Sequence, residues 1–179
     1  MDEDPVVRFD RAAAVADGAI AAVRPEQFAD PTPCTQWSIR QLIDHVVAQT
    51  LKSASMATVG SGPKRDQDVG DDPLATYRDG VHRLRAALVR PDVMSAGRNP
   101  LTWIANLLVI ELTVHAWDIA TASGQRTDID PRLAGWVLRT LREGLPPDRR
   151  GGGYAAEQPA PAYLPVADRM AAFAGRRVG

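Results

Sequence analysis

The sequence predicts an all-α protein, a four-helix bundle followed by a short carboxy-terminal appendage. Apolar residues recur at helical spacing over four long segments bounded by capping residues, proline or glycine, while strand signals are weak. A chain of 179 residues with 45% apolar and 24% charged residues suits one globular domain with a real core. We therefore expect a single domain over residues 1–179, with the bundle at about 6–124 and the appendage at about 130–179.

The first two helices are predicted over residues 6–23 and 38–56. Pro25 lies just beyond the first, where a helix would end. Ser38 and Gln41 form a capping box at the start of the second. The inner stripe of the second helix is predicted to contain four residues spaced by three and four, Leu42, His45, Val46 and Gln49.

The third and fourth helices are predicted over residues 73–90 and 101–123. Asp72 caps the third helix, a proline occupies its first turn, and Pro91 follows its end. The fourth helix is apolar nearly all round, which predicts a central position in the fold, and it ends at Gly124.

The appendage is predicted to contain two shorter helices, over residues 131–144 and 166–174. The segment between them, 146–165, is rich in proline and glycine, which predicts an extended strap over the bundle. The last helix is expected to end at Gly175.

The stretch "VIELTVHAWDIA" places ionisable residues inside the apolar fourth helix. Glu111, His115 and Asp118 are four and three residues apart and therefore share one narrow stripe. A buried carboxylate that is neither paired nor bound to a metal costs several kcal/mol or more, so these residues need partners. The pattern indicates either an ion pair or part of a metal site.

His45 is the candidate third ligand, because it lies on the apolar stripe of the second helix. Imidazole and carboxylate groups from facing helices are typical ligands of zinc, iron(II) or nickel(II), and three protein ligands leave a position open, as in catalytic sites. The simpler alternative is a hydrogen-bonded core histidine beside an ion pair of Glu111 and His115. Spacing alone leaves both alternatives open.

Charge and composition exclude several classes of partner. A formal net charge of −1 gives no reason to expect nucleic acid or an anionic membrane. No apolar run is expected to approach the roughly 20 residues that span a bilayer. The amino terminus is acidic, unlike a signal peptide, and Cys34 is the only cysteine, so we expect a cytoplasmic protein.

Three motifs resemble one known family. They are "PTPCTQWSIRQLIDHVV", "IELTVHAWDIATASGQ" and "ADRMAAFAGRR", which occur in this order, and the resemblance extends over most of the chain, from about residue 8 to 177. They are similar to the DinB-like metalloproteins, within these to the mycothiol-dependent maleylpyruvate isomerase family, and most of all to its small single-domain metal-binding branch. The resemblance implies that His45, Glu111 and His115 hold a divalent metal, usually zinc.

The resemblance also implies a chemistry. Isomerase relatives use the metal to activate mycothiol, and other relatives resemble thiol S-transferases. The expected partners are therefore a small-molecule thiol and an electrophilic substrate, bound by a monomer or a homodimer. Isomerase relatives carry a larger carboxy-terminal domain that helps to build the substrate pocket, whereas only the strap and a short helix are expected here. The maleylpyruvate reaction itself is therefore not the expected activity. The alternatives are a non-catalytic metal- or thiol-binding bundle and a metal-assisted hydrolase.

The remaining candidates have two interpretations each. Asp118 either accepts a hydrogen bond from a ligand histidine or ties its helix to a neighbouring helix end. Cys34 is expected to be packed rather than to reach the metal, His82 to lie on the surface, and most of the four tryptophans to lie in the core. Four arginines could bind a carboxylate substrate but are expected to be solvated: Arg149, Arg150, Arg176 and Arg177.

Overall fold

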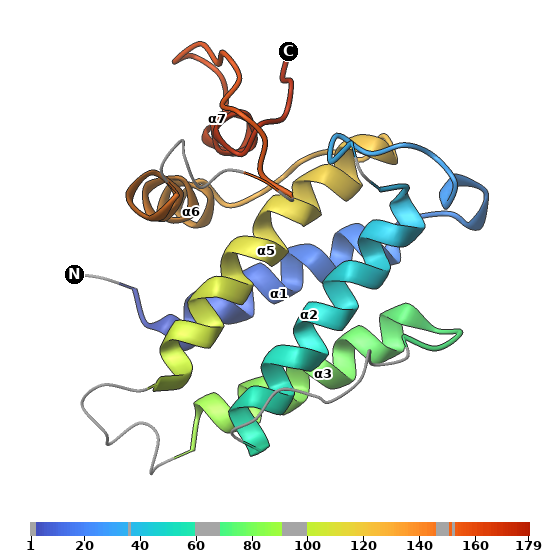
Figure 1. Ribbon diagram of the computed structural model, residues 1–179, viewed down its shortest axis with the longest axis vertical. Coiled ribbons are helices and arrows are strands. Elements are labelled where there is room, and N and C mark those ends of the chain that lie inside the picture. The colour runs from blue at the N-terminus through green and yellow to red at the C-terminus, as the bar shows by residue number, and fades with distance from the viewer. Residues whose placement is uncertain (1–2, 36, 60–68, 91–99, 146–150, 152) are drawn as a thin grey trace.

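The structure, a computed structural model, describes residues 3–35, 37–59, 69–90, 100–145, 151 and 153–179. Within these residues it contains six α-helices and one short 3-10 helix, and no β-strand. The elements are α1 (Pro5–Ala21), η1 (Pro25–Gln27), α2 (Ile39–Val59), α3 (Pro73–Leu88), α5 (Pro100–Ala122), α6 (Pro131–Gly144) and α7 (Val166–Phe173), as Figure 1 shows. The predicted all-α fold class is confirmed.

Local sequence chemistry fixes where the helices begin. An aspartate accepts a hydrogen bond from a backbone N–H of the first turn at the starts of α1, α3 and α6, and each of these helices has proline at its first position. At the start of α2 the Ser38 N–H donates to Gln41 Oε1 (3.0 Å), while the Gln41 N–H donates to Ser38 Oγ (3.4 Å). The predicted capping box is therefore present.

Helix ends agree less closely with the prediction. Gly124 and Gly175 follow α5 and α7 with φ of +70° and +97°, the left-handed conformation expected of a helix-terminating glycine. However, α1 ends at Ala21 rather than at residue 23, because Arg24 before Pro25 is extended and the chain enters η1 there. In the other direction, α2 continues past Met56 to Val59.

Helices α1, α2, α3 and α5 form the bundle. In Figure 1, α5 lies along α1 and α2, while α3 packs against α2 and α1. Helices α6 and α7 pack on each other, and both also contact α5. This arrangement agrees with a DinB-like four-helix bundle that carries a carboxy-terminal appendage.

The central helix α5 corrects the expectation about apolar runs that could span a membrane. Leu101–Ala122 is long and apolar enough to cross a membrane by length and composition, so the expectation that no run approaches that length was wrong. However, 72% of the 18-residue window of this helix that is apolar enough is buried inside the protein. Burial by α1, α2, α6 and α7 makes it the core helix of the fold.

The tryptophans correct another expectation. Trp117 on α5 is buried, but Trp103, also on α5, is 63% exposed. Trp37 and Trp136 are only partly buried against the core. Core packing therefore accounts fully for just one of the four. For Trp103 the reason is that α5 is apolar on nearly every face, so its sequence pattern does not say which side points outward.

Candidate metal centre

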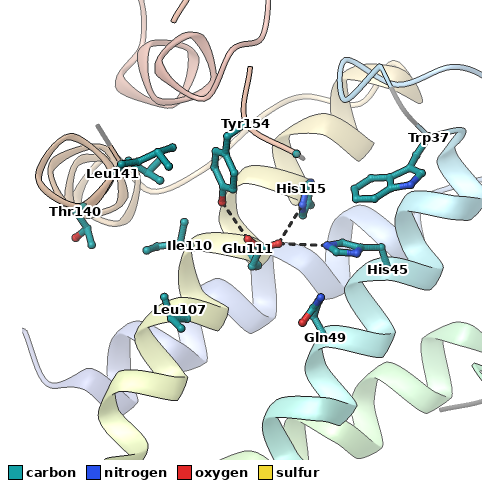
Figure 2. Close-up of a pocket in the computed structure, with 13 residues that line it drawn as sticks. Trp37, His45, Gln49, Leu107, Ile110, Glu111, His115, Thr140, Leu141 and Tyr154 are labelled. Carbon is teal, nitrogen blue, oxygen red and sulfur yellow. Dashed lines mark hydrogen bonds and ion pairs between the residues drawn. The ribbon is translucent and has the colours of Figure 1, made fainter. Parts of the chain in front are cut away.

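Two neighbouring bundle helices bring the predicted ligands together. Helix α2 supplies His45, and α5 supplies Glu111 and His115 one turn apart. Glu111 Oε2 lies 3.3 Å from His45 Nε2 and 3.3 Å from His115 Nε2 (Figure 2). The three ligand atoms lie within 4.8 Å of one another, so the group could hold one metal ion.

The donor set and its spacing fit a tetrahedral metal. Ligand atoms about 2.0–2.1 Å from a zinc ion, at the tetrahedral angle, are roughly 3.3–3.4 Å apart. The contacts of Glu111 Oε2 with His45 Nε2 and His115 Nε2 both measure 3.3 Å, which is long for a charge-assisted hydrogen bond but matches this edge length. Two imidazoles and one carboxylate are also the ligand types that zinc accepts.

Electrostatics in the metal-free cluster keeps charge on both partners. Burial raises the pKa of Glu111, but hydrogen bonds with His115 and His45 outweigh it, so that pKa lies well below its ordinary value. Burial lowers the pKa of His115, but the hydrogen bonds with Asp118 and Glu111 outweigh it and raise that pKa. The site thus holds a carboxylate beside an imidazole that binds a proton readily, and a cation can replace that proton.

Asp118 links His115 to the end of the chain. Its Oδ2 lies 3.0 Å from His115 Nδ1, while Arg176 donates from Nε to Oδ1 (2.9 Å) and from Nη2 to Oδ2 (2.7 Å). Asp118 is fully buried, and Arg176 is only 2% exposed. Asp118 therefore contacts His115 and also ties α5 to the segment after α7, whereas the expectation that Arg176 is solvated was wrong.

A tyrosine completes the hydrogen bonding of Glu111. The Tyr154 hydroxyl donates to Glu111 Oε1 at 3.1 Å (Figure 2). Burial and the neighbouring Glu111 carboxylate raise the pKa of Tyr154 well above its ordinary value, so the phenol keeps its proton and remains a donor. One oxygen of Glu111 is thus held by Tyr154, and the other faces the two imidazoles.

The cluster opens into a pocket of about 480 Å³. Its walls come from α2, α5, α6, the loop before α2 and the strap (Figure 2). They are formed by Trp37, His45, Gln49, Leu107, Ile110, Glu111, His115, Thr140, Leu141, Gly144, Leu145, Gly153 and Tyr154. The Trp37 ring stacks on His45 with centroids 4.4 Å apart, which fixes the orientation of that imidazole.

A second, smaller groove meets this pocket. It measures about 180 Å³ and runs between α2 and α5, with Gln49, Leu107 and Glu111 lining both cavities. Trp103 lines its outer part and is 63% exposed, and Leu107 is 46% exposed. Two cavities therefore converge on the same carboxylate.

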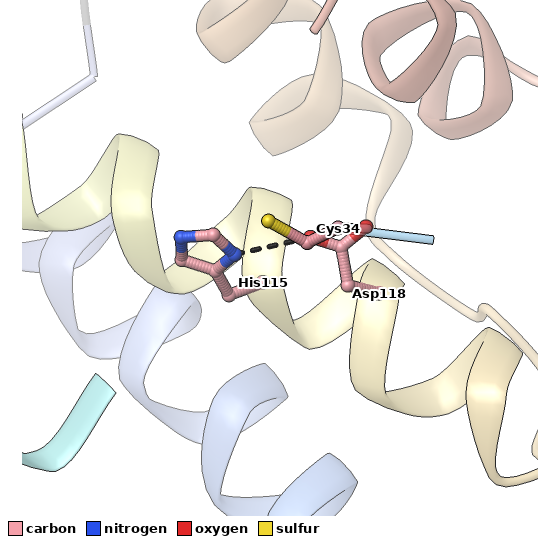
Figure 3. A group of neighbouring side chains, drawn as sticks. All are labelled: Cys34, His115 and Asp118. Atoms are coloured by element: carbon pink, nitrogen blue, oxygen red, sulfur yellow. Dashed lines mark hydrogen bonds and ion pairs between the residues drawn. The ribbon is translucent and has the colours of Figure 1, made fainter. Parts of the chain in front are cut away.

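Cys34 lies on the other side of His115. Its thiol lies within 4.8 Å of one ligand atom each of His115 and Asp118, and all three residues are buried (Figure 3). Because Arg176 binds both oxygens of Asp118, we interpret this group as a hydrogen-bonded network rather than a second metal site. The prediction that Cys34 is packed is confirmed.

Other candidates lie away from the cluster or outside the described residues. His82 is exposed on α3, as predicted. Arg177 is also exposed, whereas Arg149 and Arg150 lie outside the described residues. Sequence reasoning missed Tyr154, because the strap that carries it has no periodicity from which to infer its position.

The chain is similar to one family of domains and to two proteins of known sequence. The family model described as the mycothiol maleylpyruvate isomerase N-terminal domain matches residues 9–120. Two Mycobacterium tuberculosis proteins, uncharacterized protein MT0763 (strain CDC 1551 / Oshkosh) and uncharacterized protein Rv0738 (strain ATCC 25618 / H37Rv), are each 34% identical over 183 residues. The match covers 98% of this chain and 99% of each relative. No solved structure matches the chain significantly.

Proposed function

Because the chain belongs to the family of the mycothiol maleylpyruvate isomerase N-terminal domain, we propose that it is a metal-dependent enzyme that adds a low-molecular-weight thiol to an electrophilic small molecule. The thiol is of the mycothiol type, as the family name implies. The observation that carries the proposal is the convergence of His45, Glu111 and His115 on one point beside an open pocket.

The residues that would hold the metal are His45, Glu111 and His115, through two Nε2 atoms and Oε2. We propose zinc, and nickel or iron accept the same ligand types. When bound, such a metal lowers the pKa of a coordinated thiol, so that a thiolate is available near neutral pH. Three protein ligands leave a coordination position for another molecule, which is the pattern of catalytic rather than structural zinc sites.

The surrounding side chains prepare the pocket for this chemistry. Apolar residues of α5 and α6, such as Ile110 and Leu141, exclude water from part of the wall. Gln49 and Thr140 line the same cavity and can orient a polar reactant. Trp37 and Tyr154 hold His45 and Glu111 in place.

The proposed reaction begins with conjugate addition. The thiol sulfur forms a bond to the electrophilic carbon, the carbon–carbon π bond breaks, and the proton of the thiol ends on the neighbouring carbon. A transferase stops at this adduct. In an isomerase, the substrate rotates about the carbon–carbon bond that is now single, and the thiol is then expelled again. Both activities therefore share the addition step.

The two cavities suit a reaction of two substrates. The larger pocket and the α2–α5 groove share Glu111, so two bound molecules would meet at the cluster. Helix α6 and the strap supply walls of the larger pocket. We propose that these elements help to hold the substrate.

The alternatives are less well supported. Metal-assisted hydrolysis requires a general base near the metal, and Asp118 is engaged by His115 and by both arms of Arg176. A non-catalytic metal-binding bundle would need no substrate pocket, although it shares the ligands. We also propose a cytoplasmic location, where small thiols are kept reduced.

Elemental analysis of protein purified without chelator or affinity tag tests the metal site. We expect about one divalent ion per chain, as in single-metal zinc sites. His45→Ala and His115→Ala should lose nearly all of it, because each removes one of three ligands. His82→Ala on α3 is the matched control and should retain full occupancy.

Activity is tested with the loaded protein, reduced mycothiol and a panel of electrophiles that contain activated double bonds. Adduct or isomer formation should be detected by mass spectrometry, and the His115→Ala variant should show none. Absence of metal from the wild type, or equal loss in all three histidine variants, would contradict the ligand assignment. Metal at full occupancy without thiol turnover would favour the non-catalytic alternative.

A further inference from the structure

The carboxy-terminal segment, defined here as residues 153–179, contacts one of the three proposed ligands directly and a second one through Asp118. Tyr154 donates to Glu111, and Arg176 binds Asp118, which in turn contacts His115. This segment lies entirely outside residues 9–120, the part that the family model matches. The chain therefore supports a site of its bundle with residues of its own appendage.

Every nitrogen of the Arg176 guanidinium group donates a hydrogen bond. Nε and Nη2 donate to the two oxygens of Asp118, while Nη1 donates to the carbonyl oxygens of Gly153 (2.5 Å) and Ala174 (2.6 Å). A planar guanidinium that binds both oxygens of a carboxylate leaves that carboxylate no freedom to rotate. Asp118 is thus fixed in one orientation next to His115.

This orientation determines which nitrogen of His115 faces the cluster. Asp118 accepts a hydrogen bond from His115 Nδ1, so His115 Nε2 is directed at Glu111. A ring flipped about its axis would lose the bond with Asp118 and move Nε2 away from the other ligands. Carboxylate partners of this kind fix the tautomer of ligand histidines.

Tyr154 acts in a similar way on the carboxylate. It holds Glu111 Oε1, so that Oε2 is the oxygen that lies 3.3 Å from both imidazoles. The Arg176 guanidinium also lies over the Tyr154 ring, with its Cζ atom 5.9 Å from the ring centroid. Both contacts therefore depend on the docking of one segment.

We propose that Tyr154 and Arg176 are positioning residues of the metal centre. Arg176 acts through Asp118 to present His115 Nε2, and Tyr154 restrains Glu111 to bind through one oxygen. This inference rests on the proposed function, because it assumes that the three ligands hold a metal.

Zinc affinity, measured by competition with a chromogenic chelator, tests the proposal. The variants are Tyr154→Phe, which removes only the hydroxyl, and Arg176→Lys, which keeps the charge but loses the two-armed contact. Each should bind zinc about 10–100-fold more weakly, the usual effect of removing a partner of a ligand. The matched controls are the exposed Tyr163→Phe and Arg177→Lys, which should stay within about twofold of the wild type.

A spectroscopic signature separates positioning from general stability. In the cobalt-substituted protein, the visible absorption bands should shift in Tyr154→Phe and Arg176→Lys and remain unchanged in the two controls. Melting curves of the metal-free variants show whether they fold. Because Tyr154→Phe leaves no buried charge unpaired, it should fold even where an Arg176 variant does not.

The outcomes are distinguishable from those of the proposed function. Wild-type affinity and cobalt spectra in both positioning variants would overturn this inference and leave the metal-dependent function standing. Weakened affinity in these variants, with no thiol turnover by the loaded wild type, would support the inference and overturn the function. A wild type that binds no metal would overturn both.

Discussion

His115 combines deep burial with two hydrogen-bonding partners that are both carboxylates. Only 2% of its side chain is exposed, and it contacts Glu111 on one nitrogen and Asp118 on the other. In the metal-free protein these carboxylates favour the imidazolium, because it can donate to both. A metal ion at Nε2 would replace one proton, so metal binding and proton binding compete at this residue.

This competition predicts opposite pH dependences for the metal-free and zinc-bound protein. Burial lowers the pKa of His115, but the bonds with Asp118 and Glu111 outweigh it, so the folded pKa lies above the unfolded value of 6.5. The resulting stabilisation is fully present below pH 6.5 and is lost as pH rises through the folded pKa. Zinc affinity should instead increase over the same rise, because the competing proton leaves.

Melting temperatures of chelator-treated wild type and His115→Gln, measured across pH, check this prediction. The difference between the two proteins should shrink as pH rises, while zinc competition on the wild type should show tightening. A constant difference between the two proteins would contradict the role given to His115.

Glu111 sets the limit of stability at low pH. Burial raises its pKa, but both histidines lower that pKa by a larger amount. The stabilisation from Glu111 is therefore present above pH 4.5 and lost as pH falls through the folded pKa.

At this scale the sequence predicted the cluster but not its supports. Glu111 and His115 are one turn apart on a helix of clear boundaries, and the family motifs pointed to His45 on another, so their convergence could be predicted. Tyr154 and Arg176 belong to segments whose backbone follows no repeating pattern. Their contacts depend on how the appendage docks, which local spacing does not encode.

Among the elements, α2 and α3 pack closely at a glycine. A Cβ added to Gly80 would lie 3.0 Å from Thr50 Cγ2 and 3.3 Å from Leu51 Cδ2. Thr50 is fully buried, and its hydroxyl donates to the Val46 carbonyl oxygen at 2.8 Å, so this side chain cannot rotate away without losing a hydrogen bond. The close approach of the two helices therefore depends on the missing side chain.

Gly80→Ala should destabilise the protein. Overpacking costs about 1–3 kcal/mol and outweighs the roughly 1 kcal/mol that alanine gains over glycine within a helix. Gly18→Ala on α1 is the matched control, because nothing lies within 4 Å of its added Cβ, and it should stabilise slightly. Urea unfolding of both variants measures the difference, and a Gly80→Ala variant as stable as the wild type would show that α2 and α3 can separate at no cost.

Helix starts could be predicted from the sequence better than helix faces. Asp72 with Pro73 and Asp130 with Pro131 define their starts through local hydrogen bonds, and the structure agrees. The faces of α5 could not be assigned, because nearly every position on it is apolar. The expectation that most tryptophans lie in the core therefore failed for Trp103, which lines a groove at the surface.

Over the whole molecule, the bundle and the appendage are joined by contacts of several kinds. The Arg8 guanidinium of α1 lies 4.1 Å above the Trp136 ring of α6, and Arg11 donates to Asp130 at 2.7 Å. Trp117 Nε1 donates to Asp168 on α7 at 2.9 Å. Such contacts favour the single domain expected over residues 1–179, which stays a prediction.

We therefore expect the metal-free protein to unfold in a single transition. Urea curves followed by far-ultraviolet circular dichroism and by tryptophan fluorescence should coincide. Amide hydrogen exchange of α6 and α7 should report the same opening free energy as that of α1 and α2. Two separate transitions, or early exchange confined to the appendage, would show that residues 130–179 form an independent unit.

The ion pair between Asp118 and Arg176 has a consequence for the exchange of protein parts. It crosses the boundary between the segment shared with the family, which ends at residue 120, and the segment beyond it. A chimaera that joined this bundle to a foreign tail without an equivalent arginine would remove one partner of a buried ion pair, at a cost of about 3–5 kcal/mol. The bundle is therefore not a free-standing module that recombination could fuse to any tail, and each half constrains which versions of the other it can accept.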